Sequence, residues 1–132
     1  MIAPGGAIAV WGYGDPVLDT AELQRIVHAF NRGTIESYWL PERQLLLDGY
    51  STIVFPFDEV PAPSFTLSRQ LTLEELIGYV RTWSATARYV AEHGPAKLAE
   101  LEADLRRHWG DPDIARRVDA PLWVRAGYPT DD

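Results

Sequence analysis

Cysteine is absent from the chain, and its absence removes several kinds of chemistry. Without thiols there is no disulfide, no thiolate metal site and no cysteine nucleophile, and such a chain fits the reducing cytoplasm. Basic charge is also scarce, because 12 Lys and Arg stand against 19 Asp and Glu, for a net charge of −7. The bases do not cluster, so we expect no basic face for nucleic acid or for an anionic membrane.

Long apolar runs are missing as well. No stretch of the sequence approaches the ~20 apolar residues of a membrane-spanning helix. The N-terminus lacks the basic segment that opens a signal peptide. We therefore expect a cytoplasmic protein with neither a membrane nor a nucleic-acid partner.

The common catalytic motifs are also absent. The sequence has no Walker A loop and no HExxH, GxSxG or GxGxxG motif. His28, His93 and His108 lack the spacing of metal ligands, and the last two fall near expected helix C-termini, where a cation suits the helix dipole. We expect no metal site, and the sequence assigns no catalytic residue.

What the sequence does contain is the composition of a globular protein. Its 132 residues are 46% hydrophobic and 23% charged, which predicts a single domain spanning residues 1–132. The best-specified element is a helix over residues 72–94. Thr72 and Glu75 form a capping-box pair, and Gly94 followed by Pro95 is a stop signal. Gly78 costs helix stability, so we expect close packing there.

This helix has one apolar stripe at helical spacing: Leu73, Leu76, Ile77, Val80, Trp83, Ala87 and Val90. Before it, the unbroken apolar run over residues 7–11 predicts a strand buried on both faces, as in a parallel α/β sheet. Other patterns predict helices over residues 19–33, 41–49 and 96–109, the first capped by Asp19. Residues 53–65 read as mostly irregular, and residues 65–71 and 121–128 read as strands.

Aromatic residues are plentiful, with five Trp and six Tyr. Several lie near element ends or near the arginines Arg43 and Arg81: Tyr13, Tyr38, Trp39, Tyr79 and Trp83. Aromatic rings that border an arginine suit a pocket for a small carboxylate ligand, since guanidinium binds carboxylate through two hydrogen bonds. The alternative is that these rings only fill the core.

Taken in order, several segments resemble class I S-adenosylmethionine-dependent methyltransferases, in particular small-molecule enzymes similar to trans-aconitate methyltransferase. Ile2-Ala3-Pro4-Gly5-Gly6 resembles a PGG turn before the family's fifth strand, and YWLPER at 38–43 resembles a YWxPER segment. DGY at 48–50 and FPF at 55–57 also have counterparts. LTLEELIGYVRTWSA at 71–85 resembles WTLxQLLGYLRTWSA, and PLWVRAG at 121–127 resembles the closing strand.

The resemblance implies a partial fold. Family members carry a first strand with an acidic residue and a glycine-rich loop before the PGG turn, and these hold the cofactor. Neither is found here, so we expect strands 5, 6 and 7 of a Rossmann-like α/β fold plus the substrate-side helices, with no cofactor-binding residue in this chain. The resemblance also implies substrate contacts, above all Arg81 to an acceptor carboxylate, together with Tyr38, Trp39, Trp83, Tyr13 and Arg43.

Two functions stay open at this point. The chain is either the C-terminal, substrate-side part of a methyltransferase that takes S-adenosylmethionine from a separate N-terminal half, or a non-catalytic remnant or dimerising module. The second function would use the exposed edge of the strand over residues 7–11, because an unpaired apolar edge invites association.

Overall fold

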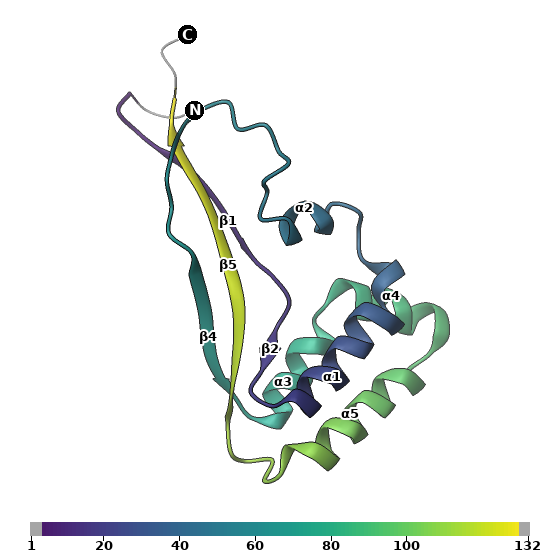
Figure 1. Cartoon of the computed structure of the whole chain (residues 1–132). Helices are drawn as coiled ribbons and strands as arrows, with labels where there is room; N and C mark the ends of the chain where they lie inside the picture. The colour runs from purple at the N-terminus through teal and green to yellow at the C-terminus, as the bar shows by residue number, and fades with distance from the viewer. Residues whose placement is uncertain (1–3, 130–132) are drawn as a thin grey trace. The chain divides into compact units, whose positions relative to one another are not determined.

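The computed structural model describes residues 4–129, and Ile2 and Ala3 of the PGG segment lie outside the described residues. The elements, in order, are β1 (Ile8–Tyr13), β2 (Val17–Leu18), α1 (Ala21–Ala29), α2 (Arg43–Leu47), β3 (Asp58–Val60), β4 (Phe65–Leu71), α3 (Leu73–Arg81), α4 (Ser84–His93), α5 (Ala96–Trp109) and β5 (Arg116–Tyr128) (Figure 1). A π-helical turn, Phe30–Thr34, and a 3-10 turn, Glu36–Tyr38, follow α1. No helix within these described residues is long and apolar enough to cross a membrane.

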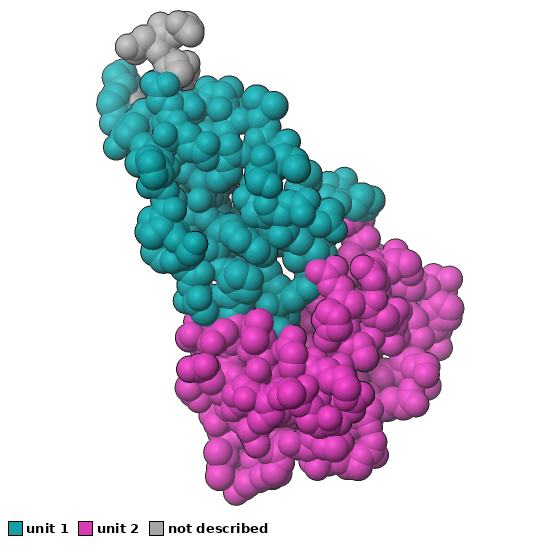
Figure 2. Space-filling model, in the orientation of Figure 1, with its two compact units in different colours: residues 1–16, 41–67, 120–132 teal, residues 17–40, 68–119 magenta. Residues whose placement is uncertain are grey.

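The chain divides into two compact units (Figure 2). The first, called unit 1, comprises residues 1–16, 41–67 and 120–132, and the second, called unit 2, comprises residues 17–40 and 68–119. The strands β4 and β5 contribute residues to both units. The helices α1, α3, α4 and α5 all belong to unit 2.

Unit 1 is built on the pairing of β1 with β5. The two strands are antiparallel, from Ile8 opposite Gly127 to Tyr13 opposite Leu122. The short strand β3 also pairs with β5, so part of the stretch expected to be irregular is a strand. Gly127 is required at this crowded position, because a Cβ there would lie 2.6 Å from the backbone oxygen of Asp58.

The prediction of a doubly buried, parallel strand over residues 7–11 is wrong. The strand is antiparallel to β5, and Val10 and Trp11 are 38% and 67% exposed. An unbroken apolar run does not by itself require two covered faces. In the described chain β1 pairs with β5 alone, so it lies at an edge of the sheet. Most of the exposed large apolar side chains belong to unit 1.

Unit 2 contains the main apolar core. Leu23, Ile26, Val27 and Phe30 are buried on the predicted face of α1. Residues of α3 and α5 complete this core: Leu73, Leu76, Ile77, Val80, Leu101, Leu105 and Trp109. The apolar faces predicted from spacing therefore pack together, and each fully buried aliphatic side chain contributes about 1.5–3 kcal/mol of transfer free energy.

The helix predicted over residues 72–94 begins and ends as expected but is interrupted. Thr72 and Glu75 form the capping box, with Glu75 Oε1 accepting from the Thr72 backbone N–H at 2.9 Å, and Gly94 has a φ of +83°. Between them, Trp83 adopts an extended conformation and separates α3 from α4. The Thr82 hydroxyl donates to the Tyr79 carbonyl at 2.6 Å, which competes with helix continuation.

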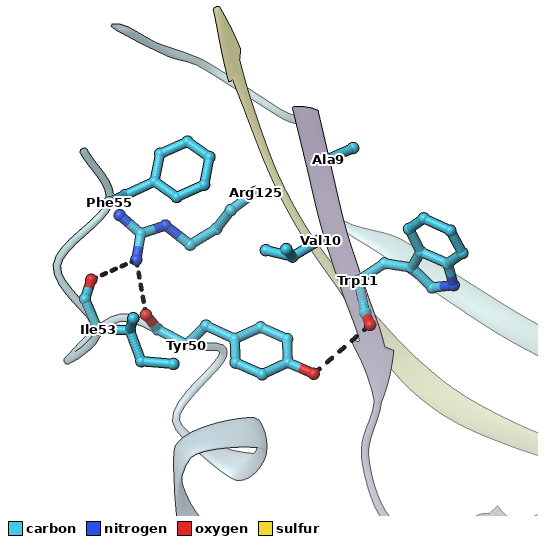
Figure 3. Close-up of a pocket in the computed structure, with 7 residues that line it drawn as sticks. All are labelled: Ala9, Val10, Trp11, Tyr50, Ile53, Phe55 and Arg125. Carbon is cyan, nitrogen blue, oxygen red and sulfur yellow. Dashed lines mark hydrogen bonds between the residues drawn. The ribbon is translucent and has the colours of Figure 1, made fainter. Parts of the chain in front are cut away.

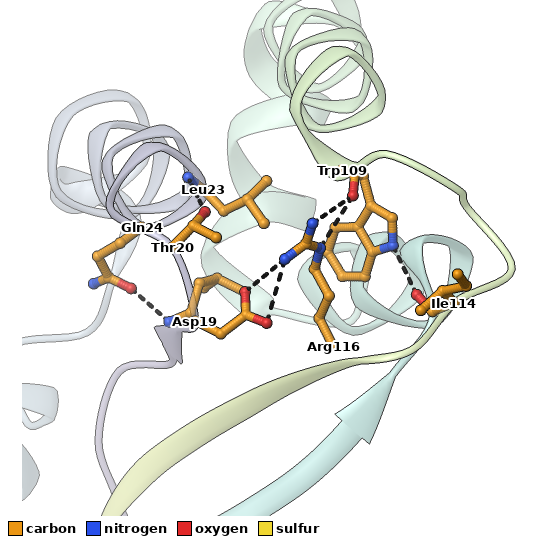
Figure 4. Close-up of polar contacts among 8 residues, drawn as sticks. Asp19, Thr20, Leu23, Gln24, Trp109, Ile114 and Arg116 are labelled. Carbon is orange, nitrogen blue, oxygen red and sulfur yellow. Dashed lines mark hydrogen bonds and ion pairs between the residues drawn. The ribbon is translucent and has the colours of Figure 1, made fainter.

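Two finer expectations about the helices are also wrong. Gly78 has open space where a Cβ would be, so close packing does not explain it. The cap of α1 is Thr20, whose hydroxyl accepts from the Leu23 N–H at 3.2 Å (Figure 4). Asp19 instead accepts from Arg116 Nη1 at 3.2 Å, and Arg116 Nη2 donates to the Trp109 carbonyl at 2.7 Å. Asp and Thr are both good caps, so only tertiary contacts decide between them.

The capping box predicts the effect of Thr72→Ala. Loss of the hydroxyl leaves the N–H of Glu75 without its acceptor, so the free energy of unfolding should fall by about 1 kcal/mol. Urea unfolding followed by far-ultraviolet circular dichroism measures it. Thr52→Ala, in an exposed turn, is the matched control. Equal losses in the two variants would contradict a stabilising role for the capping box.

Candidate functional site

A hollow of about 450 Å³ lies in unit 1 on one face of β1 (Figure 3). Val10 points into this hollow, whereas the Trp11 indole points away from it on the other side of the strand (Figure 3). The hollow is lined by residues of β1, β5 and the segment between α2 and β3: Ala9, Val10, Trp11, Tyr50, Ile53, Phe55 and Arg125. Its walls are mainly apolar, so a polar ligand would find few partners in it.

Arg125 organises one wall of this hollow. Its Nη1 donates to the carbonyls of Tyr50 and Ile53, both at 2.7 Å. Its Nε and Nη2 donate to the two carboxylate oxygens of Glu59 at 2.6 and 3.1 Å, and its guanidinium lies 4.7 Å from the Phe55 ring centroid. The hydrogen bond from Arg125 lowers the pKa of Glu59. The guanidinium of Arg125 therefore fixes the positions of Glu59 and of the Tyr50 and Ile53 carbonyls.

Gly12 and Gly14, at the end of β1, do not form a cradle for S-adenosylmethionine. A Cβ on Gly12 would lie 2.3 Å from Leu46 Cδ1 and 2.6 Å from the Tyr50 hydroxyl. A Cβ on Gly14 would lie 2.7 Å from the Trp123 ring. These glycines let side chains of unit 1 pack against the backbone, so the cofactor does not fit at this turn.

Two of the predicted substrate-binding residues, Tyr13 and Arg43, belong to unit 1. Tyr13 is 45% exposed at the end of β1 and lies opposite Leu122. Arg43 opens α2 and forms an ion pair with Asp15, in which the side chains are 17% and 24% exposed. Neither residue lines the hollow of Figure 3.

The other four predicted residues belong to unit 2, where two of them join a row of aromatic rings. The Trp39 and Trp83 rings lie 5.8 Å apart, and Tyr79 meets Trp83 edge to face at 5.5 Å. Trp39 donates through Nε1 to the buried Asn31 at 2.8 Å. Trp83 is 9% exposed, and Trp39 and Tyr79 are half-buried, so the row has both a core side and an accessible side.

Tyr38 joins the 3-10 turn to the end of α4. Its hydroxyl donates to Glu92 Oε2 at 2.9 Å and lies 2.6 Å from His93 Nε2. The pKa of Tyr38 is raised, mainly because burial disfavours the charged phenolate and secondly because its hydroxyl donates to Glu92. Its ring meets the Tyr89 ring edge to face at 5.4 Å. The Tyr38 hydroxyl is thus committed to residues of α4.

Arg81 is placed at the end of α3 and binds a carboxylate of the protein itself. Its Nε and Nη2 donate to Glu102 Oε1 on α5 at 2.8 and 2.5 Å. The Arg81 side chain is 55% exposed and that of Glu102 is 19% exposed. Sequence spacing could not reveal this pair, because Glu102 lies 21 positions away.

Arg69 on β4 is a residue that the sequence interpretation missed. Its guanidinium carbon lies 4.6 Å from the centroid of the Tyr79 ring, at the end of the aromatic row. The sequence did carry a signal, because Arg69 occupies an apolar position in the alternation of residues 65–71, between Leu67 and Leu71. All three side chains are half-buried. A cation on the inward face of a strand is uncommon and invites a specific explanation.

Within residues 4–129, no three His, Asp or Glu side chains lie close enough together to hold a metal ion.

The chain is similar in sequence and structure to proteins named as methyltransferases. No family model matches the chain. It is similar to a candidate type II methyltransferase of known structure from Anaeromyxobacter dehalogenans, with 34% identity and a TM-score of 0.85. The match covers 96% of this chain and 54% of that chain. The chain therefore has an α/β fold with a mixed sheet that matches part of a methyltransferase fold.

A candidate methyltransferase from Dictyostelium discoideum is 23% identical over 115 residues, which cover 86% of this chain and 44% of that protein. The chain thus spans about half the length of each of these relatives. The names of both relatives support a methyltransferase. Neither name mentions trans-aconitate.

The Arg125–Glu59 pair predicts a pH-dependent effect of Glu59→Gln. At neutral pH this variant should unfold at a lower urea concentration than the wild type, because Arg125 loses its carboxylate partner. A carboxylate whose pKa is depressed by folding stabilises the protein above its unfolded pKa, and this contribution is lost as the pH falls through the folded pKa. The difference in urea midpoint should therefore shrink below pH 4.5, the ordinary pKa of Glu59.

Near-ultraviolet circular dichroism at a series of pH values measures these midpoints. Glu42→Gln, which replaces an exposed glutamate that makes no side-chain cap to α2, is the control and should match the wild type. A Glu59→Gln difference that stays constant down to pH 3, roughly one unit or more below an ordinary glutamate pKa, would contradict this account of the pair.

Proposed function

We propose that this chain is the substrate-side portion of an S-adenosylmethionine-dependent methyltransferase that acts on a small molecule, with carboxylic acids as the acceptor class. The observation that carries the proposal is the match of 96% of the chain, at 34% identity, to a candidate type II methyltransferase. The motif order YWLPER, then IGYVRTWSA, then PLWVRAG supports the finer assignment to enzymes similar to trans-aconitate methyltransferase.

The proposed role of this chain is to hold and orient the acceptor. S-adenosylmethionine supplies an activated methyl group, and the residues here would position the acceptor and exclude water, because much of the catalysis of a bimolecular transfer comes from proximity and orientation. The aromatic row of Trp39, Trp83 and Tyr79 offers rings for the apolar part of such an acceptor. The cofactor would be held by the N-terminal half of the methyltransferase fold.

Calorimetric titration with S-adenosylmethionine tests this division of labour. The chain alone should give no binding heat. The chain mixed with the part of the Anaeromyxobacter relative that lies outside the match should bind S-adenosylmethionine and should methylate a small carboxylic acid. If the mixture neither binds S-adenosylmethionine nor transfers methyl groups, the proposed function fails.

One observation favours a second candidate function, that of a self-associating module. The edge strand β1 carries Val10, Trp11 and Tyr13, which are 38%, 67% and 45% exposed. An unpaired edge with exposed aromatic side chains is a template for pairing with another chain. In this reading two copies pair through β1 and no methyl transfer occurs.

Light scattering after size-exclusion chromatography measures the mass in solution. If β1 mediates self-association, the wild type should elute as a dimer and Trp11→Lys as a monomer, because a charged side chain opposes burial of the interface. Val54→Lys is the matched control, since Val54 is 87% exposed in unit 1 but lies outside β1. A wild type that is monomeric at all concentrations argues against association through this edge.

A further inference from the structure

We propose that Arg69, seated on the Tyr79 ring, is the residue of unit 2 that binds a carboxylate ligand, with the neighbouring Trp83 and Trp39 rings receiving the apolar part of that ligand. This inference rests on the proposed function and names the residue that recognises the acceptor. It differs from the assignment of that role to Arg81.

Arg69 is distinguished by hydrogen-bond donors that the protein does not use. In the part of the chain that the structure describes, its one recorded interaction is the contact of its guanidinium with the Tyr79 ring at 4.6 Å. No carboxylate or carbonyl of residues 4–129 accepts from it. A guanidinium has five N–H donors in a planar fork, and that fork matches the two oxygens of a carboxylate.

The other arginines that border the aromatic rings are already occupied. Arg81 donates twice to Glu102, so a ligand there would have to displace a carboxylate that is only 19% exposed. Arg88 donates through Nη1 to the Tyr38 carbonyl at 3.0 Å. Leaving a partly buried carboxylate without its partner is costly. Recruiting Arg69 requires no such loss.

Tyr79 prepares Arg69 for binding in two ways. A cation over an aromatic face is attracted by about 0.5–2 kcal/mol, which restricts the guanidinium before the ligand arrives. The Tyr79 and Trp83 ring centroids also lie 5.5 Å apart, and the Trp83 and Trp39 ring centroids lie 5.8 Å apart. A ligand with one carboxylate and a flat apolar body would thus meet a cation and aromatic rings in sequence.

Two acidic residues precede Tyr79 on α3, and the charge of one of them is paired with an arginine. Glu75, one helical turn before Tyr79, accepts from the Thr72 backbone N–H and lies in the capping box. Glu74 accepts from Arg106 Nη2 at 2.5 Å. Ser68 and Gln70, the neighbours of Arg69 on β4, are neutral. Arg69 is therefore a local cation in a chain of net charge −7.

Phenylacetate is a suitable probe, because it joins one carboxylate to one aromatic ring, and phenylacetamide is its neutral counterpart of the same shape. Calorimetry and tryptophan fluorescence of the whole chain should show that phenylacetate binds about tenfold more tightly than phenylacetamide, since a charge-assisted hydrogen bond is lost in the amide. Arg69→Gln should weaken phenylacetate binding by about tenfold and leave phenylacetamide unchanged.

Arg107→Gln is the matched control and should leave phenylacetate affinity within about twofold of the wild type, because Arg107 is an exposed arginine of α5 that is paired with Asp104. Arg81→Gln distinguishes the two assignments and should weaken binding less than Arg69→Gln does, because Arg81 is already paired with Glu102. Arg69→Lys should fall between Arg69→Gln and the wild type, since a lysine keeps the charge without the planar fork. Far-ultraviolet circular dichroism verifies that each variant is folded.

Three results would overturn the inference: no phenylacetate binding by the wild type, equal binding by Arg69→Gln, or an equal loss in Arg81→Gln. Inorganic phosphate that binds through Arg69 as tightly as phenylacetate does would overturn the carboxylate assignment. Phenylacetate binding is measured without methyl transfer, so a failure of this inference can be told apart from a failure of the proposed function. If carboxylates bind through Arg69 but the reconstituted mixture transfers no methyl group, the proposed methyltransferase function is refuted and the carboxylate site at Arg69 is retained.

Discussion

Backbone pairing with β5 is the constraint on which the sheet depends, because each other strand of the described sheet pairs with it. The side chains of β5 then organise each unit separately. In unit 2, Arg116 joins Asp19, before α1, to the Trp109 carbonyl at the end of α5. In unit 1, Arg125 holds Glu59 and the carbonyls of its neighbours. One strand thus supplies the hydrogen bonds of the sheet and an anchoring arginine to each unit.

Local signals in the sequence predicted the elements well, and nonlocal contacts decided the rest. The Thr72–Glu75 capping box and the left-handed Gly94 depend on residues a few positions apart, so the sequence is sufficient for both. One local feature was also missed: before the break at Trp83 the Thr82 hydroxyl donates to the Tyr79 carbonyl, which competes with helix continuation. The exposure of β1 could not be predicted, because an apolar run records what a strand can bury and not what covers it.

The candidate site likewise combines features that the sequence indicates with features that depend on the folded chain. The sequence singled out Trp39, Trp83 and Tyr79 among the aromatic residues near element ends or near Arg43 and Arg81, and the fold brings these three rings into one row. Which arginine is available depends on ion pairs between residues far apart in the sequence, such as that of Arg81 with Glu102. Only the folded chain distinguishes a paired arginine from Arg69. The substrate-binding roles of the six predicted residues stay predictions.

The measurement that tests the central claim most directly follows a deuterated methyl group from S-adenosylmethionine into small carboxylic acids by mass spectrometry. The reaction contains this chain and the unmatched part of its Anaeromyxobacter relative. The account predicts a labelled product whose formation falls more in Arg69→Gln than in Arg81→Gln. The absence of label in every acid offered, from a mixture that binds S-adenosylmethionine, would contradict the claim.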